Sequence, residues 1–554
     1  MNDRSTTLRT LALLLPLLAA CSPPPADTAA AGLADEAAGP LPWRQETLVP
    51  PGPFHGIHGI TFDADGRLLV GSVVGASIYE VDPETGAVTL FRGPPDGMAD
   101  DLAVAPDGTL AWTGFLTGTV WAQAPGDAPR RLASGLPGAN SLAFTADGRL
   151  FFTQVFLGDA LYEADLSGAT APRLIMEGMG GLNGFEFGPD GGLYGPLWFR
   201  GEIARVDVDA ATLEVVATGF EIPAAVNFDS TGRLYAVDTA RGEVLEVDLE
   251  NDAHRVIATV APAIDNLAIA PDDSIYITNM ADNAVIHVDP ESGATDVIVD
   301  SPLAVAADIA LDESGRSLWV ADVFTLRRVD LATGTVTEIA RQYADALENP
   351  LAVGVGHGRV VTTSWSAGVI QRFDAATGAS LGIHHGLPSP FDAVPLEGDA
   401  VLFVDFLGGR LIRASGADLE VRTLIAEGLE GPVAVLLDGE DAALVSEATS
   451  GRVVRIELDT GARTVLAEGL SAPEGIARSG DGALIVAEVG ARRILRIDPE
   501  DGQRQVLAAE LPIGFPAPPG VPAAYIPTGV AAAPDGSILF SSDLEAAIHR
   551  LVRP

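Results

Sequence analysis

The chain has no lysine, so all 33 of its basic residues are arginines. Basic residues are also few, because 76 Asp and Glu residues bring the formal net charge to −43. A surface this acidic repels phosphate backbones, which excludes nucleic acids as partners. Cysteine is nearly absent too: Cys21 is the only one, so no disulfide within the chain stabilises the fold. Stability must therefore come from buried apolar surface.

Turn residues and short apolar runs are abundant. Gly (61) and Pro (39) are frequent, as a turn-dense all-β protein requires. The clearest pattern is HGITFDADGRLLVGSVVGASIYEVD, at 58–82, which is followed by a further apolar run at 87–91. The four apolar runs are bounded by Gly, Asp or Pro and are rich in β-branched and aromatic residues. This pattern predicts a meander of four short antiparallel strands.

The same unit recurs along nearly the whole chain. The residue that ends its first turn serves as a register mark and falls at Gly66, Gly108, Gly148, Gly191, Gly232, Asp273, Gly315, Gly358, Asp399, Glu440, Gly482 and Gly536. Successive marks are 40–43 residues apart, except for a last step of 54. A repeat of roughly 40–45 residues with four strands is the signature of a β-propeller blade. The recurring D-x-D-G and P-D-G triplets sit at one place in every blade, which favours β-turns over calcium loops.

Twelve blades predict an all-β fold of tandem β-propellers, most simply two six-bladed rings of four-stranded blades. We place the first ring at 43–292 and the second at 293–554. In this assignment QETLV, at 45–49, completes the sixth blade of the first ring, and the strand at 296–299 completes the last blade of the second. A single twelve-bladed ring and an uneven split remain alternatives.

The N-terminal residues predict export and a lipid anchor. Residues 1–20 have two arginines followed by a short apolar core, which is typical of a signal peptide. Leu18 to Cys21 resembles the lipobox of bacterial lipoproteins, and the resemblance implies cleavage before Cys21 and lipidation of this residue. Ser22 then implies sorting to the outer membrane, and 21–42 is a Pro/Ala-rich tether. The expected location is the bacterial cell envelope, facing the periplasm or the cell surface, with membrane contact through the anchor only. An ordinary secretory signal is the alternative.

The candidate site lies at the channel mouth of the first ring, where the first strand of each blade begins. The residues eight positions before the register marks are His58, Asp100, Asn140, Asn183, Ala224 and Asp265. Asp101 and Asn266 directly follow two of them. Carboxylate and amide oxygens that converge on one axis predict a hard-cation site, and Ca²⁺ is the favoured divalent metal. Such a cation polarises a carbonyl group as a Lewis acid.

The second ring has a less complete set of polar mouth residues. Glu474 and Thr528 are polar, Pro350 is not, and Asp308 and Asp392 lie near the same level. A Pro-rich apolar segment at 511–527 predicts a loop over one mouth of this ring.

The repeat resembles that of a known family. LYAVDTARGEVLEVD, at 234–248, is similar to the gluconolactonase/senescence-marker family and to the related NHL-repeat and paraoxonase-type propellers. Asn183-Gly184, Asp265-Asn266 and Asn140-Ser141 resemble metal-ligand pairs of these families. The resemblance implies that Asn140, Asn183, Asp265 and Asn266 bind the metal. Two positions depart from the pattern: His58 stands in place of a glutamate and Ala224 in place of an aspartate.

Two functions are therefore open. The first is a metal-dependent lactonase or esterase-type hydrolase for a small lactone or ester, with His58 or Asp100 activating water. The second is a non-catalytic, NHL-like propeller pair that binds a protein, a glycan or a small ligand. The fold alone does not choose between them.

Overall fold

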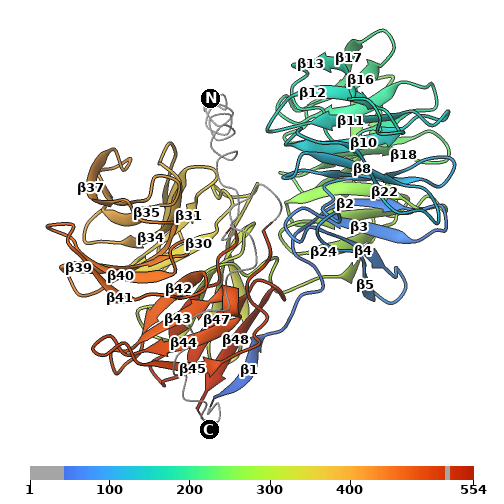
Figure 1. The fold of residues 1–554 in the computed structure, drawn as a ribbon. Coiled ribbons are helices and arrows are strands. Elements are labelled where there is room, and N and C mark those ends of the chain that lie inside the picture. The colour runs from blue at the N-terminus through green and yellow to red at the C-terminus, as the bar shows by residue number, and fades with distance from the viewer. Residues whose placement is uncertain (1–42, 518–524, 554) are drawn as a thin grey trace. The chain divides into compact units, whose positions relative to one another are not determined.

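The computed structural model describes residues 43–517 and 525–553, which form twelve four-stranded antiparallel sheets (Figure 1). The all-β fold predicted from the repeat is confirmed. Within the described part, the one helical element is a short 3₁₀ turn, η1 (Val489–Ala491). The signal peptide, Cys21 and the tether lie outside the described residues. No helix of the described ranges is long and apolar enough to cross a membrane.

Contacts divide the chain into two units, and we call 53–301 the first unit and 43–52, 302–517 and 525–553 the second unit. The sheets of the first unit are β2 (Ile57–Phe62), β3 (Leu68–Ser72), β4 (Ser77–Val81), β5 (Val88–Arg92); β6 (Leu102–Val104), β7 (Leu110–Gly114), β8 (Thr119–Gln123), β9 (Arg130–Ala133); β10 (Ala139–Phe144), β11 (Leu150–Gln154), β12 (Ala160–Ala164), β13 (Arg173–Glu177); β14 (Glu186–Phe187), β15 (Leu193–Leu197), β16 (Glu202–Asp207), β17 (Thr212–Thr218); β18 (Pro223–Phe228), β19 (Leu234–Asp238), β20 (Glu243–Asp248), β21 (Ala253–Thr259); and β22 (Ile264–Ile269), β23 (Ile275–Asn279), β24 (Ala284–Val288), β25 (Thr295–Val299).

The sheets of the second unit are β26 (Ile309–Leu311), β27 (Ser317–Ala321), β28 (Thr325–Asp330), β29 (Val336–Arg341); β30 (Ala352–Gly356), β31 (Arg359–Ser364), β32 (Val369–Asp374), β33 (Ser380–His384); β34 (Pro390–Pro395), β35 (Val401–Asp405), β36 (Arg410–Ser415), β37 (Val421–Glu427); β38 (Pro432–Leu437), β39 (Ala442–Glu447), β40 (Arg452–Glu457), β41 (Arg463–Ala467); β42 (Pro473–Arg478), β43 (Leu484–Glu488), β44 (Arg493–Ile497), β45 (Arg504–Ala508); and β46 (Val530–Ala532), β47 (Ile538–Ser542), β48 (Ala547–Val552), β1 (Arg44–Val49).

The first strands of neighbouring sheets contact one another in a series that returns to its start. In the first unit the series runs β2, β6, β10, β14, β18 and β22, and β22 contacts β2. In the second unit it runs β26, β30, β34, β38, β42 and β46, and β46 contacts β26. Each sheet thus acts as a blade with its first strand innermost, the order that a propeller requires.

The predicted assignment of the closing strands is wrong. The strand that contains QETLV is β1, and it pairs with β48 of the second unit, from Arg44 opposite Val552 to Val49 opposite Ile548. The strand β25, which we assigned to the second ring, pairs with β24 and completes the first unit. The boundary therefore follows Ser301 rather than residue 292, and the first unit is inserted between β1 and β26 of the second. The outer strands of both units are short and largely exposed, so their sequences do not distinguish the two edges.

The turns and the core follow from the repeat. In the first blade Asp63 Oδ1 accepts the backbone N–H groups of Asp65 and Arg67, both at 2.9 Å, and Gly66 adopts φ +79°. The D-x-D-G triplet is therefore a turn, as predicted. Apolar clusters lie between adjacent blades; one joins Phe151 of the third blade to Leu193 of the fourth. Packing between sheets in this way replaces the disulfides that the chain lacks.

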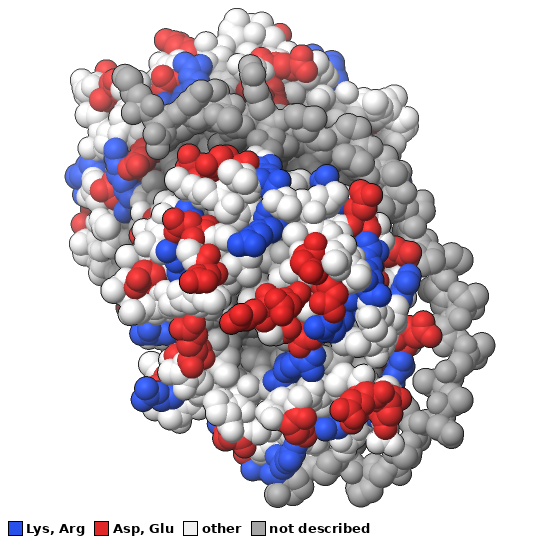
Figure 2. All heavy atoms as spheres, turned by 90° about the vertical axis from the view of Figure 1, so that its left-hand side faces the viewer, with Lys and Arg blue, Asp and Glu red and all other residues white. Residues whose placement is uncertain are grey.

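Arginines of the second unit pair with buried acids at a repeated position. Asp322, Asp405, Glu447 and Glu488 close the second strands of four blades, and each forms an ion pair with an arginine five residues later. Asp322 also accepts the N–H groups of Ala304, Val305 and Ala306, which fixes the segment leading into its own blade. Acidic and basic side chains are interspersed over the face in Figure 2, so the net charge is not one acidic patch there.

Candidate functional site

The six predicted mouth residues of the first unit lie at the start of its six innermost strands. His58, Asn140, Ala224 and Asp265 are in β2, β10, β18 and β22. Asp100 lies two residues before β6, and Asn183 lies three residues before β14. Asp100, Asn140, Asn183 and Ala224 are buried, whereas His58 and Asp265 keep partial exposure. Because the innermost strands contact in a closed series, these residues share one end of the channel.

Threonine hydroxyls on second strands hold two of these strand starts. Thr113 donates its hydroxyl to the carbonyl of Asn140 in the next blade. Thr278 donates its hydroxyl to the carbonyl of His58 in the same way. These bonds between blades fix the backbone from which the mouth side chains project.

The amides of the third and fourth blades are joined through one hydroxyl. Ser141 Oγ lies 2.8 Å from Asn140 Oδ1 and 2.9 Å from Asn183 Oδ1. Asn183 Oδ1 also accepts the N–H of Gly184 at 3.0 Å. Because a hydroxyl has one proton, Ser141 donates to only one of the two amides at a time. Sequence reasoning placed both amides at the mouth but did not anticipate this bridge.

A second link crosses from the sixth blade to the second. Asn266 Nδ2 donates to Asp101 Oδ1 at 2.9 Å. Asp101 also accepts the N–H of Leu102 at 2.8 Å. The first blade has Gly59 at the equivalent position, where an added Cβ would meet the carbonyl oxygen of Asp100 at 2.5 Å. The absence of a side chain at this position lets the chain segments approach closely.

Burial sets the electrostatics of the mouth. Burial, followed by repulsion from Asp265 and Asp101, raises the pKa of Asp100 well above its ordinary value. Burial also raises the pKa of Asp101 to about 7 and, together with repulsion from Asp101, that of Asp265 to about 7. Burial lowers the pKa of His58 to about 4. The hydrogen bond of its ring to the carbonyl of Gly56 has a smaller, opposite effect and raises the pKa. At neutral pH the mouth thus has a neutral imidazole and acids that share protons, a combination suited to proton transfer.

The donor set suits a hard cation, but part of it is already hydrogen-bonded. Asn183 Oδ1 accepts the N–H of Gly184 and lies within hydrogen-bond distance of Ser141 Oγ, and Asn266 Oδ1 accepts the N–H of Leu267 at 2.9 Å. Among the residues that the structure describes, no three His, Cys, Asp or Glu side chains are grouped so as to hold a metal ion. A cation at the mouth would therefore combine carboxylates such as Asp265 with amide oxygens such as that of Asn140. The predicted metal ligands remain a prediction.

Four aromatic residues border the mouth, and we call them the aromatic shelf: Phe115, Phe156, Trp198 and Phe199. They lie in the turns that follow β7, β11 and β15, the second strands of three adjacent blades. Sequence reasoning missed them. A signal was present, because Phe115, Phe156 and Phe199 each lie seven or eight residues after a register mark.

The second unit has buried acids on alternate blades. Asp308, Asp392 and Glu474 precede or lie in the first strands of its first, third and fifth blades. Each accepts a backbone N–H from the next blade, from Val353 at 3.0 Å, Val435 at 2.7 Å and Thr528 at 2.7 Å respectively. Burial raises the pKa of Asp308 to about 7 and those of the other two well above their ordinary values. These acids link the blades, and sequence reasoning recognised them only as isolated candidates.

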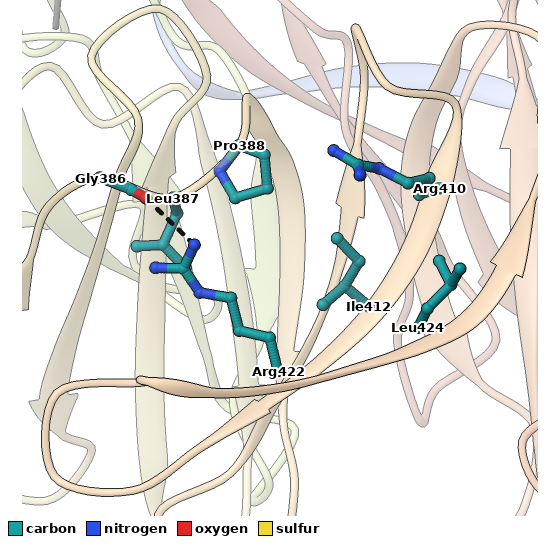
Figure 3. Close-up of a pocket in the computed structure, with 7 residues that line it drawn as sticks. All are labelled: Gly386, Leu387, Pro388, Arg410, Ile412, Arg422 and Leu424. Atoms are coloured by element: carbon teal, nitrogen blue, oxygen red, sulfur yellow. Dashed lines mark hydrogen bonds between the residues drawn. The ribbon is translucent and has the colours of Figure 1, made fainter.

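A surface groove of the second unit is lined by none of these acids. Its volume is about 470 Å³. Figure 3 shows its lining, in which Arg422 donates to the carbonyl of Gly386 at 3.1 Å. Arg410 of the same groove is paired with Asp405. The guanidinium groups of Arg410 and Arg422 are therefore already bound to acceptors of the protein.

Blades with innermost first strands, and a mouth of acids and amides at one end, define the chain as a β-propeller protein. Residues 44–324 match the SMP-30/Gluconolactonase/LRE-like region, and the chain belongs to this family. The predicted family resemblance is confirmed, and the match spans the first unit. No curated protein matches the chain in sequence. Among solved structures, the chain is similar to the extracellular domain of BT4673 from B. thetaiotaomicron, with 12% identity and a TM-score of 0.32 over 90% of this chain and 76% of that one.

Proposed function

We propose that the first unit is a divalent-metal-dependent hydrolase of small lactones or esters, with its active site at the channel mouth. The observation that carries the proposal is the gathering of Asp100, Asp101 and Asp265 at one mouth, where burial raises all three pKa values and repulsion between the acids adds to those of Asp100 and Asp265. Buried acids of this kind need a proton or a cation to offset their charge. Membership of the SMP-30/Gluconolactonase/LRE-like family supports the reaction class.

The proposed cation ligands are Asp265, Asn140, Asn183 and Asn266, with Ca²⁺ as the favoured metal. Binding by Asn183 requires Ser141 to turn its hydroxyl to Asn140, which its position between the two oxygens allows. A bound cation would supply Lewis-acid polarisation of the substrate carbonyl. Asn140, Asp265 and Asn266 project from strands, so the positions of their oxygens are fixed before substrate arrives.

The proton acceptor is Asp100, with His58 as the alternative. The raised pKa of the Asp100 carboxyl makes it a stronger base than an exposed aspartate once it is ionised. His58 is neutral at neutral pH because burial lowers its pKa to about 4, so its ring nitrogen accepts a proton only weakly. The burial of Asp100 and Asn140 limits water at the mouth and strengthens these interactions.

The test is metal analysis of purified protein followed by hydrolysis of a lactone panel with and without chelator. We expect bound divalent metal and chelator-sensitive turnover, and at least tenfold lower kcat for Asp265→Asn. As a matched control, Asp296→Asn changes an exposed acid of β25 in the same unit and leaves turnover unchanged. Absence of both metal and chelator-sensitive hydrolysis would refute this function.

The second candidate is a non-catalytic propeller pair that binds a protein, a glycan or a small ligand. The engaged amide oxygens of Asn183 and Asn266 favour it, since these atoms already have protein donors. A metal-free protein without hydrolytic activity leaves this candidate standing.

We further propose that the chain is an envelope lipoprotein anchored through Cys21, which lies outside the described residues. The lipobox-like sequence supports this location. Cys21→Ser should move the protein from the membrane fraction to the soluble fraction, and unchanged fractionation would contradict the anchor.

A further inference from the structure

We propose that the aromatic shelf binds an uncharged alkyl or aryl substituent of the substrate, so that the first unit prefers apolar lactones or esters to polyhydroxylated ones. The reaction itself rests on the proposed function. The shelf is a binding surface for the substituent, which is the part of the substrate that does not react.

The shelf is hydrogen-bonded to the chain segments that lead to the mouth amides. Trp198 donates its backbone N–H to the carbonyl of Gly181 at 2.9 Å, and the carbonyl of Phe115 accepts the N–H of Gly138 at 2.8 Å. Gly138 and Gly181 each lie two residues before a mouth amide, Asn140 or Asn183. The shelf is therefore joined by backbone hydrogen bonds to the segments that carry both amides.

The shelf is preformed and partly open to solvent. Phe156 is at its centre, with ring centroids 5.3 Å from Trp198, 5.5 Å from Phe199 and 6.1 Å from Phe115. Phe199 is 38% exposed, and Phe115 and Phe156 are half-buried. Edge-to-face contacts hold these rings in fixed orientations.

Phe156 adopts a backbone conformation that phenylalanine rarely takes. Its φ is +66°, in the left-handed region that favours glycine. Strain at a bulky residue persists where the surrounding structure imposes it, and such residues cluster at ligand sites. A glycine or asparagine would relieve the strain but would remove the ring from the shelf.

The cation next to Phe199 is paired with an acid, which disfavours a charged substituent. Arg200 follows Phe199 and pairs with Glu202 at 2.7 Å. The hydroxyl groups of a polyhydroxylated ring would lose water against the aromatic faces without gaining partners. An alkyl or aryl group instead gains by leaving water.

The first test compares γ-hexyl-γ-butyrolactone with unsubstituted γ-butyrolactone and gluconolactone. We expect the highest kcat/KM for the hexyl lactone. In Phe199→Ala this value should fall roughly tenfold, while kcat/KM for the unsubstituted lactone stays unchanged. A thermal melt of Phe199→Ala that matches wild type excludes misfolding as the cause. The control Leu90→Ala removes an exposed apolar side chain (63% exposed) from β5 and should leave kcat/KM unchanged for both lactones.

The second test does not depend on hydrolysis. Binding of γ-hexyl-γ-butyrolactam and γ-butyrolactam is measured by calorimetry on wild type and Phe199→Ala. Tighter binding of the hexyl lactam, lost in Phe199→Ala, supports the shelf even if no lactone is hydrolysed. Equal affinity for the two lactams, or an equal preference in Phe199→Ala, would overturn the shelf proposal alone, whatever the outcome for catalysis.

Discussion

The amide nitrogen of Asn266 lies 2.9 Å from Asp101 Oδ1 and joins the sixth blade of the first unit to its second blade. The first blade lies between them in the series of contacts and has Gly59 at the equivalent position. The bond therefore ties together blades that are not neighbours in the contact series. It restrains Asp101 and Asn266 at the mouth. Such restraint is needed at a site that must hold charged groups in place.

Converting this amide to an acid should make the first unit sensitive to pH. In Asn266→Asp a second carboxyl faces Asp101, whose pKa is already raised to about 7 by burial. We expect near-normal stability at about pH 5, where one proton is shared, and a clear loss at about pH 8, where both acids ionise. Thermal melts at the two pH values measure this. The control is Asn251→Asp, which makes the same change at the exposed Asn251–Asp248 bond and should show little pH dependence.

Adding a methyl group at Gly59 should destabilise the first unit. In Gly59→Ala the Cβ would lie 2.5 Å from the carbonyl oxygen of Asp100 and 2.7 Å from the Cα of Asp101. Backbone cannot give way as a side chain does, so we expect a loss of about 2–4 kcal/mol in the free energy of unfolding. Denaturant unfolding measures the loss. Gly93→Ala, where the nearest atom is 3.5 Å away, should be close to neutral. Equal stabilities of the two variants would contradict the close approach at Gly59.

Removing the charge of Asp265 should alter how stability depends on pH. Its folded-state pKa of about 7 lies above the unfolded value, so its contribution is fully present below about pH 4 and is lost as the pH rises through about 7. The variant Asp265→Asn has no carboxyl at this position and therefore does not lose this stability as the pH rises. We therefore expect the melting temperature of the variant, relative to wild type, to increase between about pH 5 and pH 8. A constant difference between the two proteins would show that Asp265 is not held neutral by its surroundings. Added Ca²⁺ should raise the melting temperature of wild type at about pH 8 and leave the variant nearly unchanged.

Breaking a buried ion pair of the second unit should cost far more than breaking an exposed one. Glu488 is 2% exposed, pairs with Arg493 and accepts the N–H of Ser471 at 2.7 Å. Arg493→Met leaves this carboxylate buried without its cation, and we expect a loss of about 3 kcal/mol in unfolding free energy. Arg44→Met breaks the exposed pair with Glu46 in the same unit and should cost less than about 1 kcal/mol. Similar losses in the two variants would contradict a structural role for the buried pair.

The insertion of the first unit predicts which fragment folds. The fragment 53–301 contains all four strands of each of its six sheets. The fragment 43–292, cut where the sequence pattern suggested, loses β25 and leaves the edge of β24 unpaired. We expect the first fragment to be monomeric with a cooperative melt and the second to aggregate. Size-exclusion chromatography and thermal melts distinguish them, and equal behaviour would contradict the strand assignment.

The repeat period alone predicted the blades, because four short strands with fixed turns leave little choice of local structure. It did not predict which edge β1 and β25 complete. Both strands expose most of their side chains, and the choice depends on distant contacts, such as that of Val49 with Ile309 and Ile548 in one apolar cluster. Long-range pairing of this kind leaves no local signature.

The level of the mouth residues followed from counting within the repeat, and all six lie where the innermost strands begin. The hydrogen bonds of these residues could not be predicted by counting within the repeat. The bridge from Ser141 to two amides depends on the position of one oxygen. In the second unit the count found Glu474, but Asp308 and Asp392 are one residue further along, so the acids on alternate blades did not appear as one set. A one-residue shift in a strand is enough to hide such a pattern.

The insertion also determines how the units can be separated. Within the described ranges, the polypeptide passes from one unit to the other twice, between Gly52 and Pro53 and between Ser301 and Pro302. A protease that nicks either crossing leaves the first unit attached through the other, so its release requires two cuts. Strand β1 stays paired with β48 after both cuts. An anchor attached ahead of β1 would therefore stay with the second unit, and the first unit would no longer be covalently joined to it.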